Sequence, residues 1–110
     1  MDRDGVHQRY GIPFAVLEKY ENAKVQIEGT LAIYDDSAIG ELGLIMSFLD
    51  FGFSWDEITC YMQMKNDGNY RDCLVLLSKK RNSMLEEIHK KEKLISRIDY
   101  LKYEMKKSLV

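Results

Sequence analysis

The chain has 110 residues, two cysteines and a formal net charge of −2, which suits one small domain with an extension and is too little for two independent cores. No apolar run approaches the roughly 20 residues that span a bilayer, and the charged first ten residues differ from a secretory signal. Two cysteines are too few for a disulfide framework. We therefore expect a cytoplasmic protein with no membrane partner.

The charges are divided unevenly along the chain. Residues 1–72 contain six Lys or Arg and thirteen Asp or Glu, so this part carries −7. Residues 73–110 contain ten basic and five acidic residues and carry +5. Two such segments attract each other or partners of the opposite charge.

The first residues predict two short helices. Asp4 is placed to cap a first helix over 5–10, and Gly11 breaks that helix. Pro13 suits the first turn of a second helix over 13–21, because a helix needs no backbone N–H donor there.

A β-hairpin and a third helix are predicted next. Residues 25–34 begin by alternating apolar and polar side chains and contain Gly29 near their middle, which is typical of a hairpin with its turn at that glycine. One of the two aspartates at 35–36 then caps a helix that runs to about Phe51, and Gly52 is placed to end it.

The strongest helix-start signal in the chain is a capping box. Ser54 stands three residues before Glu57, so each side chain can bond the other residue's backbone N–H. Phe53 and Ile58 have the spacing of a hydrophobic staple. The fourth helix is expected to run to about Met64, and a turn follows it.

From Tyr70 to Leu109 the sequence contains no Pro and no Gly, which predicts one helix of about 60 Å. Its apolar residues recur in steps of three, four and seven, as in a coiled-coil seam. Arg81, Lys91 and Lys102 interrupt this seam. A lone helix cannot bury such a stripe, so we expect a homodimer through this helix. The predicted seam contains Leu77, Met84, Ile88, Ile95, Ile98, Met105 and Leu109.

Three stretches carry a resemblance to a known family. They are residues 11–21 (GIPFAVLEKYE), residues 34–58 with the string GFSWDEI at their end, and residues from 76 onward (LLSKKR). In order and approximate spacing they resemble the turn and recognition helix, the second helix pair, and the start of the dimerisation helix of the MerR family of bacterial transcription regulators.

The resemblance implies a fold that is all-α with a small β-hairpin wing. A winged helix-turn-helix head over 1–69 would precede a long antiparallel coiled-coil dimerisation helix over 70–110. It also implies a transcriptional regulator that binds double-stranded DNA as a dimer and acts without a separate effector domain. The candidate DNA contacts are Gln8, Arg9, Phe14, Lys19, Lys24 and Tyr34, and the candidate dimer contacts are Leu77, Met84, Ile88, Ile95, Ile98 and Met105.

The departures from the family pattern fall on the DNA-contact positions. Arginines of the family align with Ala15, Glu18 and Ala32 here. DNA affinity depends on neutralising phosphates, so a head that carries −7 would be repelled by the duplex. Two hypotheses stay open: a MerR-like DNA-binding regulator, and a degenerate MerR-like dimer that no longer binds DNA. The second would act as a protein-interaction module through its acidic head or through a surface at Met46 and Phe48.

Catalytic and metal-binding patterns do not stand out. Cys60 and Cys73 form no Cys-x-x-Cys pair, and His7 and His89 are far from them in sequence. The chain has no Gly-rich phosphate loop and no Ser/His/acid motif. We therefore predict no metal site, no cofactor and no enzymatic activity.

Overall fold

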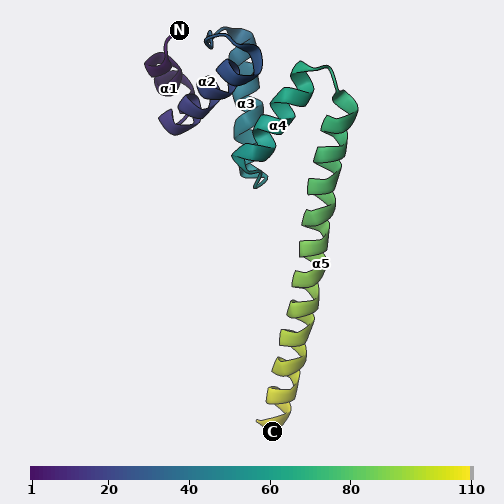
Figure 1. Cartoon of the computed structure of the whole chain (residues 1–110). Coiled ribbons are helices and arrows are strands. Elements are labelled where there is room, and N and C mark those ends of the chain that lie inside the picture. The colour runs from purple at the N-terminus through teal and green to yellow at the C-terminus, as the bar shows by residue number, and fades with distance from the viewer. Residues whose placement is uncertain (110) are drawn as a thin grey trace. The chain divides into compact units, whose positions relative to one another are not determined.

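The computed structural model describes residues 1–109, and in that range the chain forms five α-helices and no strand (Figure 1). It divides into a compact unit, Met1–Cys73, which we call the head, and a second unit from Leu74 onward, which we call the shaft. The helices are α1 (Arg3–Tyr10), α2 (Phe14–Glu28), α3 (Asp36–Asp50), α4 (Trp55–Asn66) and α5 (Tyr70–Ser108).

The predicted β-hairpin wing, and with it the winged helix-turn-helix, is wrong. The residues expected to form its first strand instead continue α2 to Glu28. Gly29 is not a hairpin turn but the C-cap of α2: its φ is 71° and its N–H donates to the Val25 carbonyl, a left-handed conformation that glycine adopts without a Cβ penalty. Residues 30–34 connect α2 to α3 without regular structure.

The reason α2 is longer than predicted lies in its buried side chains. Val16, Tyr20 and Ala23 are buried and Ile27 is half-buried, and their spacing of four, three and four residues is that of one helical face. This helical period extends through the residues whose local alternation had indicated a strand. An ion pair of 2.9 Å between Lys24 and Glu28, one turn apart, also stabilises the last turn.

Most of the predicted helix boundaries are confirmed within a few residues. α1 begins earlier than expected because Asp2, not Asp4, accepts from the Gly5 N–H at 2.8 Å. Gly11, with a φ of 67°, ends it as predicted. Asp35 caps α3 by accepting from the Ala38 N–H at 2.9 Å.

The predicted capping box at the start of α4 is confirmed. The Ser54 hydroxyl accepts from the Glu57 N–H at 3.2 Å, and the Glu57 carboxylate accepts from the Ser54 N–H at 3.0 Å. α4 extends two residues beyond the predicted Met64. It follows Gly52, which has a φ of 87° and marks the end of α3 as predicted.

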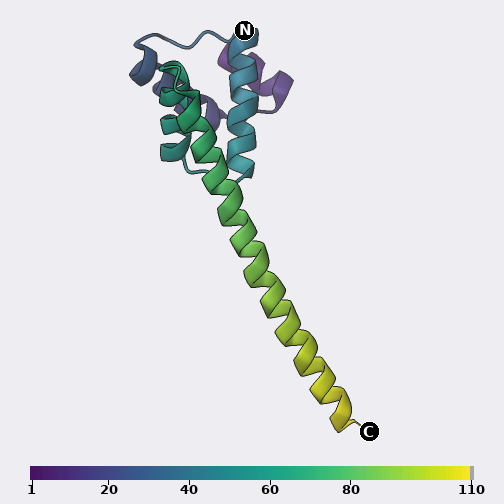
Figure 2. The same ribbon diagram turned by 90° about the vertical axis from the view of Figure 1, so that its right-hand side faces the viewer.

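The hydrophobic core of the head lies among α1, α2, α3 and α4 (Figures 1 and 2). α2 packs against both α1 and α4. The largest fully buried side chains come from all four helices, and α5 contributes Cys73 at its first turn. The fully buried set is Val6, Leu17, Tyr20, Leu42, Ile45 and Ile58.

The predicted long helix is present as α5, which has 39 residues and a length of about 60 Å at 1.5 Å per residue. Cys73 is the one residue of α5 that is buried in the described part of the chain. Among residues 1–109, no helix is both long enough and apolar enough to cross a membrane.

Candidate functional site

The predicted seam of α5 forms an uncovered apolar stripe. The exposed fractions of its side chains are 45% for Met84, 50% for Ile88, 57% for Ile95, 57% for Ile98 and 67% for Met105. Leu77, the remaining candidate dimer residue, is half-buried. Seam residues three, four and seven apart share one side of a helix, so these side chains follow one side of the shaft, with Lys91 and Lys102 between them.

The centre of the seam is hollowed. A surface depression of about 370 Å³ is lined by three apolar and three charged residues: Met84, Ile88, Ile95, Glu87, Lys91 and Glu92. An apolar hollow between successive turns is the shape that receives a side chain from a facing helix in knobs-into-holes packing. The stripe can therefore accept another helix along its length.

Two of the candidate DNA contacts on α2 contact other side chains of the head. The ring of Phe14 stacks on the imidazole of His7, with the ring centroids 4.0 Å apart. The Lys19 ammonium lies 5.5 Å from the centre of the Trp55 ring. Both residues keep exposed surface.

The candidates on α1 face solvent. Gln8 and Arg9 are exposed near the end of α1. The Arg9 guanidinium lies 5.5 Å from the ring centre of its neighbour Tyr10. These two side chains are free to meet another molecule.

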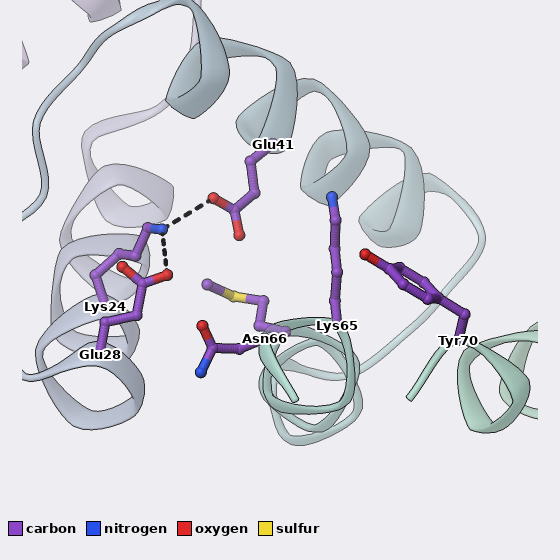
Figure 3. A pocket seen from close by; sticks show the side chains of 7 residues that line it. Lys24, Glu28, Glu41, Lys65, Asn66 and Tyr70 are labelled. Carbon is purple, nitrogen blue, oxygen red and sulfur yellow. Dashed lines mark hydrogen bonds and ion pairs between the residues drawn. The ribbon is translucent and has the colours of Figure 1, made fainter. Parts of the chain in front are cut away.

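Lys24 is bound to carboxylates within the head. Its ammonium lies 2.9 Å from a Glu28 oxygen and 3.3 Å from a Glu41 oxygen (Figure 3). Burial lowers the pKa of Lys24, but the hydrogen bond to Glu28 and the charge of Glu41 outweigh it, so the pKa is raised. Tyr20 also donates to Glu41, at 2.9 Å. The charge of Lys24 thus neutralises carboxylates of its own chain.

Tyr34 also points into the head. Its hydroxyl donates to a Glu21 oxygen at 2.6 Å, and Arg3 forms an ion pair with the same carboxylate. The hydrogen bond from Arg3 lowers the pKa of Glu21 although partial burial opposes it. Burial and then the Glu21 contact raise the pKa of Tyr34. This network joins α1, α2 and the α2–α3 connection.

Sequence reasoning missed Arg3, Glu21 and Glu41 as partners of the candidate residues. Arg3 and Glu21 are separated by 18 positions, and Tyr34 and Glu21 by 13 positions. No local motif marks such pairs, because the fold alone brings them together. As a result, two of the six candidate DNA contacts, Lys24 and Tyr34, bind carboxylates of the head.

The surface proposed at Met46 and Phe48 is largely covered. Phe48 is 5% exposed and Met46 is half-buried. The Phe48 ring packs edge-on against Tyr61, at 4.5 Å between centroids, and against Phe53 at 5.2 Å. Phe48 is therefore a core residue between α3 and α4.

A polar hollow of about 280 Å³ lies beside the Lys24 ion pairs (Figure 3). Lys24 and Glu28 line one side of it, and Lys65 and Tyr70 line the other. Its lining carries charges of both signs, but the carboxylates near Lys24 already hold a cation.

The two cysteines differ in their exposure to solvent. Cys60 is exposed and Cys73 is buried, and both are free thiols. Burial raises the pKa of Cys73, which keeps that thiol protonated and unreactive at neutral pH. Residues 1–109 bring together no group of three His, Cys, Asp or Glu side chains that could hold a metal ion.

Comparison with protein-family models, curated proteins and solved structures finds no match to this chain. Membership of the MerR family therefore stays a prediction from the residues quoted above.

Proposed function

We propose that this chain is a dimeric protein-interaction module. Its shaft pairs with the shaft of a second copy, and its acidic head contacts another protein. The observation that carries the proposal is the uncovered seam from Met84 to Met105, whose side chains are 45–67% exposed. Most of the stability of a helix in a protein comes from packing its apolar face, so a helix of this length with a bare apolar stripe needs a partner helix.

The charges around the seam favour a second copy as that partner. With Ile88 and Ile95 at heptad position a and Ile98 at position d, the seam itself contains three cations, Arg81, Lys91 and Lys102. The e and g positions that flank it contain three carboxylates, Glu87, Glu92 and Asp99, and two lysines, Lys80 and Lys106. Two copies of α5 can therefore pair seam cations with flanking carboxylates of the other chain.

The apolar surface that a dimer would cover is substantial. Fully burying a Leu, Ile or Met side chain contributes about 1.5–3 kcal/mol, so covering the exposed half of one contributes about 1 kcal/mol. Two copies would cover ten such side chains, which gives about 10 kcal/mol of apolar burial, a gain comparable to the free energy that association costs.

The electrostatics of the head support a protein partner over DNA. Residues 1–72 carry −7, and their ion pairs already occupy Arg3 and Lys24. The residues that align with family arginines, Ala15, Glu18 and Ala32, supply no cation to a phosphate.

A MerR-like DNA-binding regulator is the second candidate. The observation that favours it is the exposure of Gln8, Arg9 and Lys19 on α1 and α2, which leaves a few polar and basic groups free for a duplex. This candidate requires salt-sensitive binding to DNA of any sequence, because phosphate neutralisation releases counterions.

Two measurements on the purified full-length chain test the proposal. Sedimentation velocity is expected to show a dimer at micromolar concentration. Fluorescence anisotropy with a labelled random-sequence duplex is expected to show no binding at low salt. A monomer would refute the proposed pairing, and duplex binding that weakens steeply with salt would favour the regulator.

A charge-restored variant makes the DNA measurement decisive. Ala15→Arg, Glu18→Arg and Ala32→Arg together add four positive charges where the family has arginine. The control, Asp50→Arg with Asp67→Arg, adds four charges elsewhere on the head. If only the first variant binds DNA more tightly and with a steeper salt dependence, the face that contains residues 15, 18 and 32 contacts DNA once cations are present. Equal binding by both variants would reflect net charge only.

A further inference from the structure

The connection between α2 and α3 has the side-chain alternation of a β-strand although it pairs with none in the described chain. Leu31 is 82% exposed and Ile33 is 76% exposed, whereas Ala32 and Tyr34 between and after them are half-buried. Alternation with a period of two is the rule for an extended chain that lies with one face on a surface. Figure 2 shows this connection crossing from the end of α2 to the start of α3 at the periphery of the head.

The inward face of this connection is anchored. The Tyr34 hydroxyl donates to Glu21 of α2 at 2.6 Å, and the Tyr34 ring lies 6.3 Å from that of Tyr20. The Asp35 N–H donates to the Ile33 carbonyl at 3.0 Å, which makes a tight turn directly before α3. Leu31 and Ile33 therefore project outward from a segment whose ends are held by the head.

The backbone of this segment is free to pair. In residues 1–109, the Asp35-to-Ile33 bond is the only backbone–backbone hydrogen bond that residues 30–34 make. Within the described residues, the other N–H and C=O groups of this segment have no backbone partner, as on the edge of a sheet. An extended peptide could add to such an edge by main-chain hydrogen bonds and bury alternate side chains.

The flanking charges select the kind of peptide. Asp35 and Asp36 follow the segment directly and are exposed. Glu28 precedes the segment, and its carboxylate is paired with Lys24, which also contacts Glu41. Parallel pairing with the same segment of a second copy would bring the aspartates of the two chains together, which disfavours that arrangement.

We propose that residues 30–34, which we call the docking strand, bind an extended segment of another protein in which alternating apolar residues are flanked by lysine or arginine. The main-chain groups of residues 30–34 pair with the peptide, Leu31 and Ile33 cover its apolar side chains, and the carboxylates of Asp35 and Asp36 attract its basic residues. This inference rests on the proposed function, because it names the partner chemistry of the interaction module.

A designed peptide pair tests the docking strand. Fluorescein-labelled KKVTVTVKK is titrated with the full-length protein, and EEVTVTVEE is the charge-reversed probe. The basic probe is expected to bind at least about tenfold more tightly than the acidic probe. Hydrogen exchange of the Leu31, Ala32 and Ile33 amides is expected to slow when the basic probe is bound. Failure of the basic probe to bind, equal binding of both probes, or protection elsewhere would overturn the proposal.

Variants of the chain separate a docking role from a folding role. Leu31→Ser with Ile33→Ser removes the two outward side chains and is expected to weaken binding of the basic probe about tenfold or more. Because both side chains are exposed, the melting temperature should stay the same. The control, Leu44→Ser with Val75→Ser, changes exposed apolar residues of α3 and α5 and should bind as the wild type does. Equal loss of binding by both pairs would refute the docking strand.

Sedimentation of the same samples distinguishes the two proposals. A dimer that does not bind the basic probe would refute the docking strand and leave the pairing of the shafts intact. A monomer that binds the basic probe through Leu31 and Ile33 would refute the pairing and leave the docking strand intact.

Discussion

Replacing Ile95 and Ile98 with aspartate perturbs the middle of the α5 seam directly. Each side chain is 57% exposed in the single chain, and covering that part is worth about 1–1.5 kcal/mol. A dimer covers four of these side chains, so about 4–6 kcal/mol of apolar burial is lost. Four carboxylates would also be desolvated at the interface, each at a further cost. The dimer should therefore weaken by at least about a thousandfold.

Sedimentation velocity at micromolar concentration measures this change, and far-ultraviolet circular dichroism follows the helix content. The seam variant is expected to sediment as a monomer and to lose helix signal, because an isolated exposed helix is marginally stable. Tyr100→Asp with Tyr103→Asp is the matched control. These residues are 62% and 58% exposed and lie at heptad positions f and b, outside the seam. Their replacement adds the same charge as the seam variant. A seam variant that stays dimeric, or a control that dissociates equally, would refute the proposed seam.

Two further predictions concern the head. Glu21→Gln should lower the melting temperature at neutral pH and make the melting temperature depend less on pH. The pKa of Glu21 is lower in the folded chain than its unfolded value of about 4.5. The ionised carboxylate therefore stabilises the fold above that value, and this stability is lost as the pH falls through the folded pKa. Thermal denaturation across a series of acidic pH values checks this, and an acid limb unchanged from the wild type would contradict it. Ser54→Ala removes half of the capping box and should cost about 1 kcal/mol in the free energy of unfolding, measured by urea denaturation. Ser37→Ala, at an exposed position in the first turn of α3, is its control, and equal stability of the two variants would argue against the cap.

The ends of the helices could be predicted because their signals are local. The Ser54–Glu57 box and the Asp35 cap each join groups three residues apart, so the interaction forms within one turn of chain. Gly11 and Gly52 adopt positive φ values at helix ends, which a short stretch of sequence also indicates. Such signals do not depend on distant residues.

The error at residues 25–34 has a tertiary cause. Val25 and Ile27 alternate with polar residues as in a strand, but Ile27 also continues the helical stripe of Tyr20 and Ala23. Both periods are present in the sequence over this short range. Burial of Ala23 against the rest of the head selects the helical one, and Gly29 then serves as a C-cap.

The interpretation of the candidate DNA contacts changed for a similar reason. Lys24 and Tyr34 have the residue types of phosphate contacts, but their partners Glu41 and Glu21 lie 17 and 13 positions away in the chain. Only the packing of α2 against its neighbours brings these groups within hydrogen-bond distance. The residue types therefore indicated that both side chains could contact phosphate, but the fold directs them to carboxylates of the head.

By itself, the sequence determined that this protein has a long, continuous helix with an apolar seam, and where most of the shorter helices begin. Helix periodicity and capping act over one or two turns, so the order of residues is sufficient for them. The tertiary structure alone decided the end of α2, the inward pairing of Lys24 and Tyr34, and the outward face of Leu31 and Ile33. Those outcomes depend on which distant groups share the core and on which side chains it leaves in solvent.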